Sequence, residues 1–125
     1  MEHEDVRTWV ASYEKAWRST GTAALPGLFT EEAGYVVSPW APAVEGMDAI
    51  GRLWEAERDG ADEEFTMDSE VVAVDGDIAV VRVEVDYARE GAGRWRDLWL
   101  LRFDVDGRCS HFEEWPFSPD QPDGH

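Results

Sequence analysis

The feature that most constrains this chain is the alternation of apolar and polar residues that fills its second half. Side chains of a β-strand point alternately to its two faces, so a period of two predicts strands with one buried face. The dipeptides Asp75-Gly76 and Asp106-Gly107 interrupt the pattern, and Asp-Gly is a strong signal for a tight hairpin turn. With a longer turn over 89–93, they predict four antiparallel strands, at 65–74, 77–88, 94–104 and 108–115.

The first half of the chain has the spacing of helices instead. Residues 5–18 repeat apolar side chains at intervals of three and four, which predicts an amphipathic helix. A short helix is expected from Leu25 to Phe29, and a third from Met47 to about Arg58. Between these two, residues 34–38 predict a short strand and Val44-Glu45 a brief return strand.

Helices followed by an antiparallel meander predict an α+β fold, in which three helices pack on one face of a curved, mainly antiparallel sheet. The length of 125 residues is typical of one domain. We therefore expect a single domain over 1–125, with its core at about 5–117. Residues 118–125 have few side chains to bury and are expected to form a flexible tail.

The charge of the chain excludes several classes of partner. Eleven Lys and Arg stand against 28 Asp and Glu, a formal net charge of −17, which repels phosphate backbones and anionic lipid. We therefore expect no nucleic-acid and no membrane partner. The single cysteine, Cys109, cannot form an intramolecular disulfide, and its place in a strand favours a core residue over a nucleophile. Without a signal peptide or a long apolar run, the protein is expected to be cytoplasmic.

Four stretches resemble the nuclear-transport-factor-two-like superfamily, in particular its SnoaL-like branch. They are Tyr13 in the first helix, residues 28–33 (LFTEEA), residues 44–50 (VEGMDAI) and residues 101–108 (LRFDVDGR). The resemblance spans 5–117 and implies a cone-shaped roll, whose bent sheet wraps around the first helix and encloses a pocket. The superfamily includes polyketide cyclases, ketosteroid isomerase, scytalone dehydratase and limonene epoxide hydrolase, so it implies a fold more than an activity.

The predicted inner face of strands 77–88 and 94–104 contains a single charged residue. Of its ten side chains only Asp97 carries a charge, and a carboxylate is costly to bury unless it is paired or protonated. Asp97 is therefore predicted to be a catalytic acid or base with a raised pKa. The alternative is a structural Asp97 at the mouth of the cone, bonded to a tryptophan indole or an arginine.

Tyr13 is the second predicted catalytic residue, as a hydrogen-bond donor from the inner face of the first helix. The resemblance matches it with the oxyanion-hole tyrosine of ketosteroid isomerase, whose mechanism also requires two aspartic acid residues. Ser38 and Trp99 occupy the matching positions here, so ketosteroid isomerase activity is disfavoured. The alternative for Tyr13 is a core tyrosine whose hydroxyl is satisfied locally.

Seven tryptophans are spread along the chain, and they either line a cavity or fill the core. The predicted ligand-binding residues are mainly aromatic, with one further carboxylate: Trp17, Trp40, Trp54, Tyr87, Trp99, Phe112 and Glu114. Trp40 is expected to act as a lid contact. The role of Glu114 depends on the register of the last strand, because a slip of one residue would turn His111 inward instead.

No pattern in the sequence predicts a metal or a cofactor. Zinc-ligand spacing of Cys and His is absent, and no glycine-rich phosphate loop follows a strand. The acidic residues between 59 and 64 lack the alternating oxygen ligands of a calcium loop.

The outer face of the predicted sheet contains an apolar patch, formed by Ile78, Val80, Leu98 and Leu100. Such a patch is a liability when it is exposed. We therefore expect a homodimer that packs sheet against sheet through this face.

Together these features favour cofactor-independent binding of a small apolar or aromatic molecule. If the protein is an enzyme, proton transfer of the lyase, isomerase or cyclase type is expected, with Asp97 and Tyr13 in the catalytic roles. The alternative is a non-catalytic module for small-ligand binding or for dimeric interaction, with a filled core.

Overall fold

The computed structural model describes residues 1–58, 64–89 and 93–121. Three helices and two strands occupy the first half: α1 (His3–Trp17), α2 (Leu25–Leu28), β1 (Phe29–Val36), β2 (Val44–Glu45) and α3 (Met47–Glu57). Four long strands form the second half: β3 (Phe65–Asp75), β4 (Ile78–Tyr87), β5 (Arg94–Phe103) and β6 (Cys109–Phe117). The order of elements is the one that the residue periodicity predicts.

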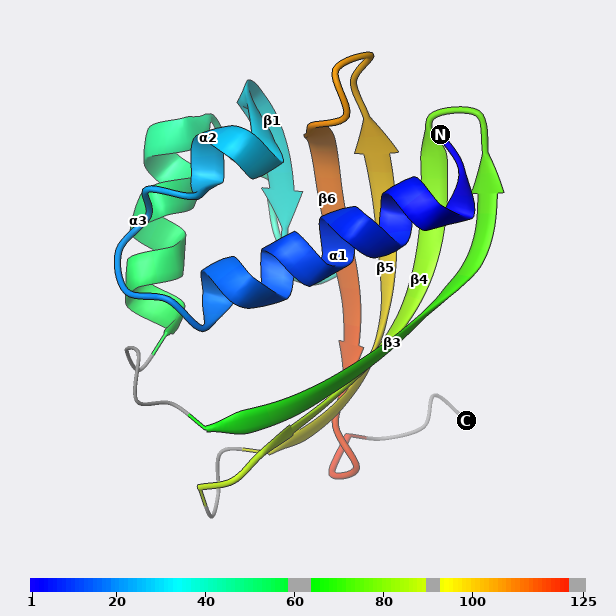
Figure 1. The fold of residues 1–125 in the computed structure, drawn as a ribbon. Coiled ribbons are helices and arrows are strands. Elements are labelled where there is room, and N and C mark those ends of the chain that lie inside the picture. Colours follow the sequence, from blue (N-terminus) through cyan, green and yellow to red (C-terminus); the bar gives the residue numbers. More distant parts are fainter. Residues whose placement is uncertain (59–63, 90–92, 122–125) are drawn as a thin grey trace.

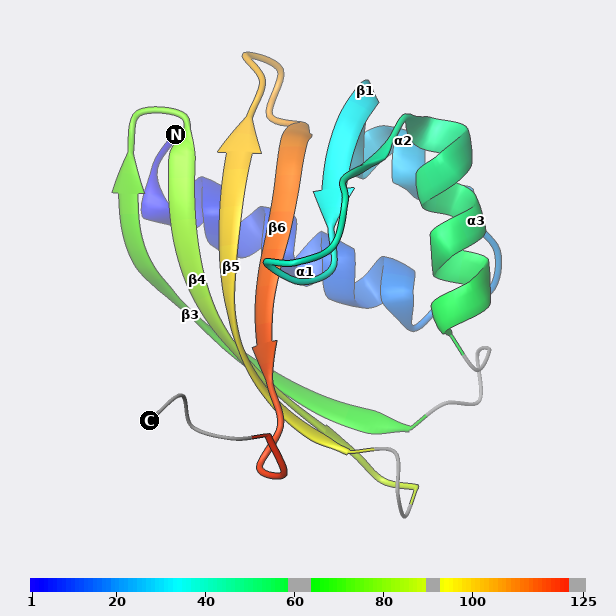
Figure 2. The same ribbon diagram turned by 180° about the vertical axis from the view of Figure 1, so that it is seen from behind.

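The strands form one six-stranded sheet in the order β2-β1-β6-β5-β4-β3. Every neighbouring pair is antiparallel except β1 and β6, which run parallel. The sheet is strongly curved, and α1 lies across its concave face, while α2 and α3 lie beside β1 (Figures 1 and 2). This arrangement confirms the predicted α+β roll of helices on a curved, mainly antiparallel sheet.

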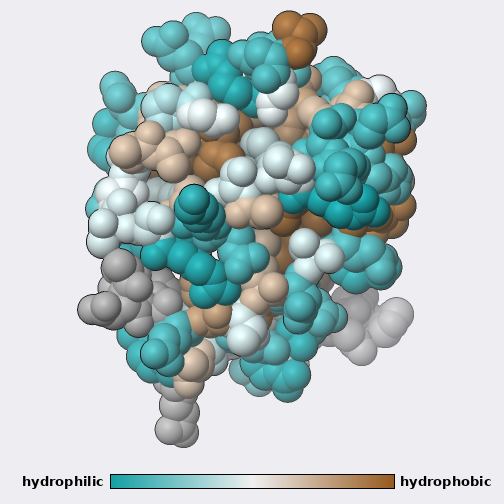
Figure 3. Space-filling model, viewed as in Figure 1, coloured by the Kyte–Doolittle hydropathy of each residue, from teal (hydrophilic) through white to brown (hydrophobic). Residues whose placement is uncertain are grey.

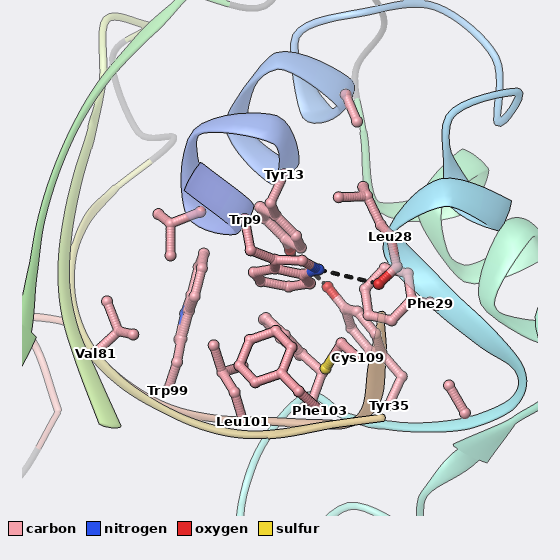
Figure 4. Close-up of a cluster of buried hydrophobic side chains, with 14 of the residues drawn as sticks. Trp9, Tyr13, Leu28, Phe29, Tyr35, Val81, Trp99, Leu101, Phe103 and Cys109 are labelled. Carbon is pink, nitrogen blue, oxygen red and sulfur yellow. Dashed lines mark hydrogen bonds between the residues drawn. The ribbon is translucent and has the colours of Figure 1, made fainter. Parts of the chain in front are cut away.

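The buried stripe of α1 fills much of the space inside the curved sheet. Val6, Trp9, Val10 and Tyr13 are all less than a tenth exposed, as expected for the inward face of an amphipathic helix. The Trp9 indole donates a hydrogen bond to the carbonyl oxygen of Leu28 at 3.0 Å, which ties α1 to α2 (Figure 4). This half of the roll is therefore a packed aromatic core.

The register of the long strands decides which side chains face the helices. Trp99 lies opposite Glu114, and Leu101 lies opposite Phe112. Glu114 therefore shares the inner face with Asp97, whereas His111 lies on the outer face, where its Nε2 is 3.1 Å from Glu113. Of the two registers that the sequence allows, the one that turns Glu114 inward is confirmed.

Two element boundaries differ from the predicted ones for identifiable reasons. Helix α1 begins at His3, two residues early, because the Asp5 carboxylate accepts a hydrogen bond from the backbone N–H of Glu2 at 2.8 Å. Strand β1 begins at Phe29, directly after α2, because Phe29 already pairs with Cys109 of β6. Helix α3 ends at Glu57, within one residue of its predicted end, whereas residues 90–92 of the predicted turn and residues 122–125 of the predicted tail lie outside the described residues.

The surface exposes both hydrophilic and apolar side chains. The side that carries α1 is mainly hydrophilic, with smaller hydrophobic areas (Figure 3). On the outer face of the sheet, Ile78 is 39% and Leu98 is 42% exposed. Among the described helices, none is long and apolar enough to cross a membrane.

Candidate functional site

A cavity of about 250 Å³ lies between the curved sheet and the C-terminal ends of α1 and α3. Five aromatic side chains line it: Trp17, Tyr35, Trp54, Tyr87 and Trp95. Three carboxyl groups, of Asp97, Glu114 and Glu57, also line it. Apolar walls with a few polar groups are typical of small-molecule sites, and this volume is slightly below the usual range of about 300–1,000 Å³. The cavity therefore suits a small ligand.

Strands β5 and β6 bring the two carboxyl groups of Asp97 and Glu114 to the same wall. Glu114 lies opposite Trp99, two residues along from Asp97, so the two residues are diagonal neighbours on one face of the sheet. Asp97 is 8% exposed and is the one charged residue in the buried class among the described residues. Within the described chain, neither carboxyl forms an ion pair with an arginine or lysine.

The surroundings of this pair raise the pKa of both carboxyl groups. Burial raises the pKa of Glu114 well above its ordinary value, and the neighbouring charges of Asp97 and Glu57 raise it further. Burial also raises the pKa of Asp97, against the opposing effect of the polar groups of Glu114 and Trp99. The two groups titrate together, and the pair keeps a proton at pH values at which an exposed glutamic acid has lost its own.

Three buried polar atoms near the cavity lack a hydrogen-bond partner among the described residues. They are Oδ1 of Asp97, Nε1 of Trp54 and Nε1 of Trp99. An unsatisfied buried polar group costs free energy, and such groups are rare in folded proteins. Asp97 and Trp54 both line the cavity, so a polar ligand could pair with one acceptor and one donor there.

The sequence as a whole matches a known family. Residues 9–112 match the family model described as the SnoaL-like domain. The chain belongs to this family. No curated protein matches the sequence.

Solved structures with the same fold extend over nearly the whole of this SnoaL-like domain. A proposed polyketide cyclase from Sinorhizobium meliloti is 25% identical, with a TM-score of 0.67 over 91% of this chain and 99% of that one. A ketosteroid isomerase-like protein from Erwinia carotovora is 21% identical, with a TM-score of 0.64 over 94% and 98%. A protein of unknown function with a cystatin-like fold from Methylobium petroleophilum is 16% identical, with a TM-score of 0.75 over 100% and 83%. These similarities establish the fold of the SnoaL-like domain.

Tyr13 of the SnoaL-like domain lies behind the cavity wall. Its hydroxyl is 2.7 Å from the hydroxyl of Tyr35, and its ring stacks on Phe112 with the centroids 5.3 Å apart. Burial raises the pKa of both tyrosines well above the ordinary value, so both stay neutral. Tyr35 lines the cavity and Tyr13 does not. Tyr13 can therefore act on a ligand only indirectly, through the hydrogen bond between the two hydroxyls.

The other predicted site residues divide into three groups. Trp17, Trp54, Tyr87 and Glu114 line the cavity together with Asp97. Trp99 and Phe112 face the same side of the sheet but lie outside the cavity, because the ring of Tyr13 packs on both, at 4.8 and 5.3 Å between centroids. Trp40 is 96% exposed and does not line the cavity, so the structure gives it no contact of the kind expected for a lid.

The sequence leaves open whether the tryptophans line a cavity or fill the core, and the structure contains both kinds. Trp9 and Trp99 are buried in the core, where Trp9 packs edge-on against Phe103 with 5.6 Å between centroids. Trp17, Trp54 and Trp95 line the cavity. The core is therefore filled under the first part of α1 and open toward its C-terminal end.

Sequence reasoning missed seven of the twelve residues that line the cavity, and the three of these that are aromatic or charged each had a signal. Tyr35 lies two residues after Ala33 on the inward face of β1, so the period of two contained it. Glu57 follows Trp54 by three residues and therefore shares its face of α3. Trp95 precedes Asp97 by two residues on the same face of β5.

Two further classes of site find no support in the described residues. Cys109 is fully buried, its Sγ is 3.1 Å from the carbonyl oxygen of His111, and burial raises the pKa of the thiol to about 12. Such a thiol is a poor nucleophile at neutral pH. No group of three or more His, Cys, Asp or Glu in residues 1–58, 64–89 and 93–121 is arranged to hold a metal ion.

Proposed function

We propose that this SnoaL-like protein binds a small apolar or aromatic molecule in the cavity and moves a proton on it. The chemistry would be of the isomerase, lyase or cyclase type and would need no cofactor. The observation that carries the proposal is the Asp97–Glu114 pair, two carboxyl groups on neighbouring strands inside one aromatic cavity. Positioned carboxyl groups with raised pKa values are effective general acids and bases near neutral pH.

Each carboxyl has a distinct role in such a reaction. The Asp97 carboxylate, with its unpartnered Oδ1, takes a proton from a carbon next to a carbonyl group of the ligand. Glu114, whose pKa is raised further from its ordinary value, holds the proton that is given to the ligand's oxygen or to its leaving group. In an elimination, transfer of the proton from Asp97 to Glu114 then returns the pair to its starting state. In an isomerisation, Asp97 instead gives its proton to another carbon of the enol, and Glu114 takes back the proton from the oxygen. The surrounding aromatic walls exclude water, which strengthens these interactions.

The same geometry separates this proposal from the ketosteroid isomerase mechanism. The residue at the position of that enzyme's second donor, Trp99, is packed in the core and does not line the cavity. Here both acidic groups come from the middle of β5 and the end of β6. The tyrosines on the cavity wall are Tyr35 of β1 and Tyr87 of β4.

Deuterium exchange tests this function without knowledge of the natural substrate. A panel of small cyclic and aromatic ketones is incubated in D₂O, and deuterium uptake next to the carbonyl is followed by NMR. We expect uptake on at least one ketone, lowered about 100-fold or more in the Asp97→Asn and Glu114→Gln variants. Glu113→Gln is the matched control, because Glu113 adjoins Glu114 on β6 but points to the outer face.

Two outcomes would refute catalysis by this pair. One is equal uptake by wild-type protein and the Asp97→Asn variant. The other is a carbon-13 NMR titration in which both carboxyl groups have ordinary pKa values. Raised pKa values without exchange on any ketone would instead support the non-catalytic ligand-binding module.

A further inference from the structure

The cavity is acidic, and the described residues that line it include no basic side chain. Every group with a titratable proton on its wall is an acid: Asp97, Glu114, Glu57 and the tyrosines Tyr35 and Tyr87. No arginine, lysine or histidine lines it within the described chain. The field inside the cavity therefore disfavours an anionic ligand and favours a cation.

Arg58 packs against two tryptophans of the cavity wall, with its guanidinium carbon 5.9 Å from the ring centroid of Trp17 and 5.4 Å from that of Trp54. The guanidinium of Arg58 donates hydrogen bonds to the carbonyl oxygens of Ser19 at 2.6 Å and Gly21 at 2.8 Å. It also pairs with the Glu55 carboxylate at 2.9 Å. Arg58 itself does not line the cavity, and its charge is compensated by the Glu55 carboxylate and these carbonyl oxygens.

The aromatic walls are of the kind that binds organic cations. Trp17 and Trp54 meet at 71° with their ring centroids 4.8 Å apart, which forms an aromatic corner at the edge of the cavity. Trp95 and Tyr87 lie on the sheet side of the same cavity. The negative face of an indole or phenol ring attracts an ammonium group, most strongly where water is excluded.

A third observation points to a ligand with a hydrogen-bond donor. Asp97 is more than nine-tenths buried, it lines the cavity, and its Oδ1 has no hydrogen-bond partner among the described residues. A purely apolar ligand would leave this oxygen with no partner except the proton that Asp97 and Glu114 share, and an anion would be repelled by the pair. An N–H group that carries a positive charge would satisfy it with a charge-assisted hydrogen bond.

We propose that the cavity selects small organic cations, in which a protonated amine is attached to an apolar or aromatic group. The ammonium group would lie between Asp97 and Glu114, and the apolar part would pack against Trp17 and Trp54. A volume of about 250 Å³ suits a ligand with one aromatic ring. This inference names the ligand class of the cavity used in the proposed function and rests on the same site.

Three probes of equal size and different charge test the inference. Benzylamine is a cation at neutral pH, benzyl alcohol is neutral and benzoate is an anion. Calorimetric titration, with quenching of tryptophan fluorescence as a second readout, gives the affinity of each. We expect benzylamine to bind at least about tenfold more tightly than benzyl alcohol, a difference of about 1.4 kcal/mol, and benzoate to bind most weakly.

Variants assign this preference to the carboxyl groups. Combining Asp97→Asn with Glu114→Gln should remove the preference, so that the ratio of benzylamine affinity to benzyl alcohol affinity falls to about one. Glu57→Gln, at the rim, should give a smaller loss, and the outer-face variant Glu113→Gln none. If the double variant does not fold, the comparison of the three probes on the wild-type protein decides alone.

The inference is overturned if benzyl alcohol or benzoate binds as tightly as benzylamine, or if benzylamine does not bind at millimolar concentration. Its failure is distinguishable from that of the proposed function. Amine selectivity without deuterium exchange would uphold the ligand class and refute the proton-transfer chemistry. Exchange on neutral ketones without amine selectivity would do the reverse.

Discussion

At the scale of single residues, a pair of buried hydroxyl groups connects the core with the cavity. The hydroxyls of Tyr13 and Tyr35 are 2.7 Å apart, and either can donate the hydrogen bond. Only Tyr35 also lines the cavity. The two tyrosines therefore differ in what each would lose if its partner were removed.

Replacing Tyr35 by Phe should destabilise the protein more than replacing Tyr13 by Phe. Tyr35→Phe leaves the Tyr13 hydroxyl buried without its partner, at a cost of about 1–3 kcal/mol. Tyr13→Phe leaves the Tyr35 hydroxyl beside a cavity that water can enter, and should cost about 0.5–1.5 kcal/mol. Urea unfolding of both variants and of the double variant measures these values. Equal losses, or a larger loss for Tyr13→Phe, would contradict the assigned environments.

At the scale of elements, the end of α3 is fastened to the end of α1. The Arg58 guanidinium, directly after α3, donates to the carbonyl oxygens of Ala16 at 3.3 Å and Ser19 at 2.6 Å. A positive charge at these carbonyls also complements the dipole of α1. The contact sets the spacing of the two helix ends that carry Trp17 and Trp54, two walls of the cavity.

The variant Arg58→Lys should weaken this connection although it keeps the charge. An ammonium group cannot reproduce the planar arrangement of donors with which Arg58 spans several carbonyls. We expect a loss of about 1–3 kcal/mol in the free energy of unfolding, measured by urea denaturation. Arg52→Lys, on an exposed position of α3, is the control and should have little effect. Equal stability of the two variants would show that the Arg58 contacts contribute nothing.

The pleat of β6 gives two adjacent glutamic acid residues opposite properties. Glu114 faces the cavity, and burial raises its pKa. Glu113 faces outward, where hydrogen bonds from the Trp115 indole at 2.7 Å and then from His111 lower its pKa. Residues one position apart on a strand lie on opposite faces. The register of a single strand therefore decides which of the two carboxyl groups has a lowered pKa and which has a raised one.

At the scale of the whole molecule, the free energy of unfolding should depend on pH through Glu114. Its pKa is raised in the folded state, so the native protein keeps a proton that the unfolded chain has lost. Stability should therefore fall as pH rises through the window from the ordinary value of about 4.3 up to the raised folded pKa. The groups that face Glu114 are Asp97 and Glu57, with the neutral hydroxyls of Tyr13 and Tyr35.

Glu114→Gln isolates this effect from the repulsion among the many other acids, which also grows with pH. Urea unfolding at several pH values should show a shallower decline in the variant than in the wild-type protein. Parallel curves for the two proteins would mean that Glu114 titrates normally in the folded state.

The outer face of the sheet should bind a second copy of the chain. Leu98 and Ile78 are 42% and 39% exposed there, and Trp115, opposite Leu98 on β6, is 39% exposed. We expect light scattering at micromolar concentration to report about twice 14.1 kDa. Leu98→Glu should produce a monomer, because a carboxylate would be buried at the interface. Val105→Glu, a fully exposed site in the last hairpin, should leave the dimer intact. A wild-type monomer would refute this assembly.

The sequence by itself determined the elements and the buried faces of the two strands β4 and β5. Period-two alternation and the Asp-Gly turns are local signals, and they place Asp97 on the inner face without knowledge of the fold. The same holds for the inward stripe of α1 and for Trp54 on α3. These features follow from side-chain directions within one helix or strand, which depend only on neighbouring residues.

Only the tertiary structure decided which inward side chains meet in a cavity. Glu114 faces inward because β6 pairs with β5 in one register, past an irregularity between Arg102 and Phe103. Tyr35 reaches Tyr13 across 22 residues of sequence, and Tyr13 in turn covers Trp99 and Phe112 and keeps them out of the cavity. The cavity is the volume left between the ends of α1 and α3 and the sheet. That volume depends on how distant segments pack, and the periodicity of a single segment contains no information about it.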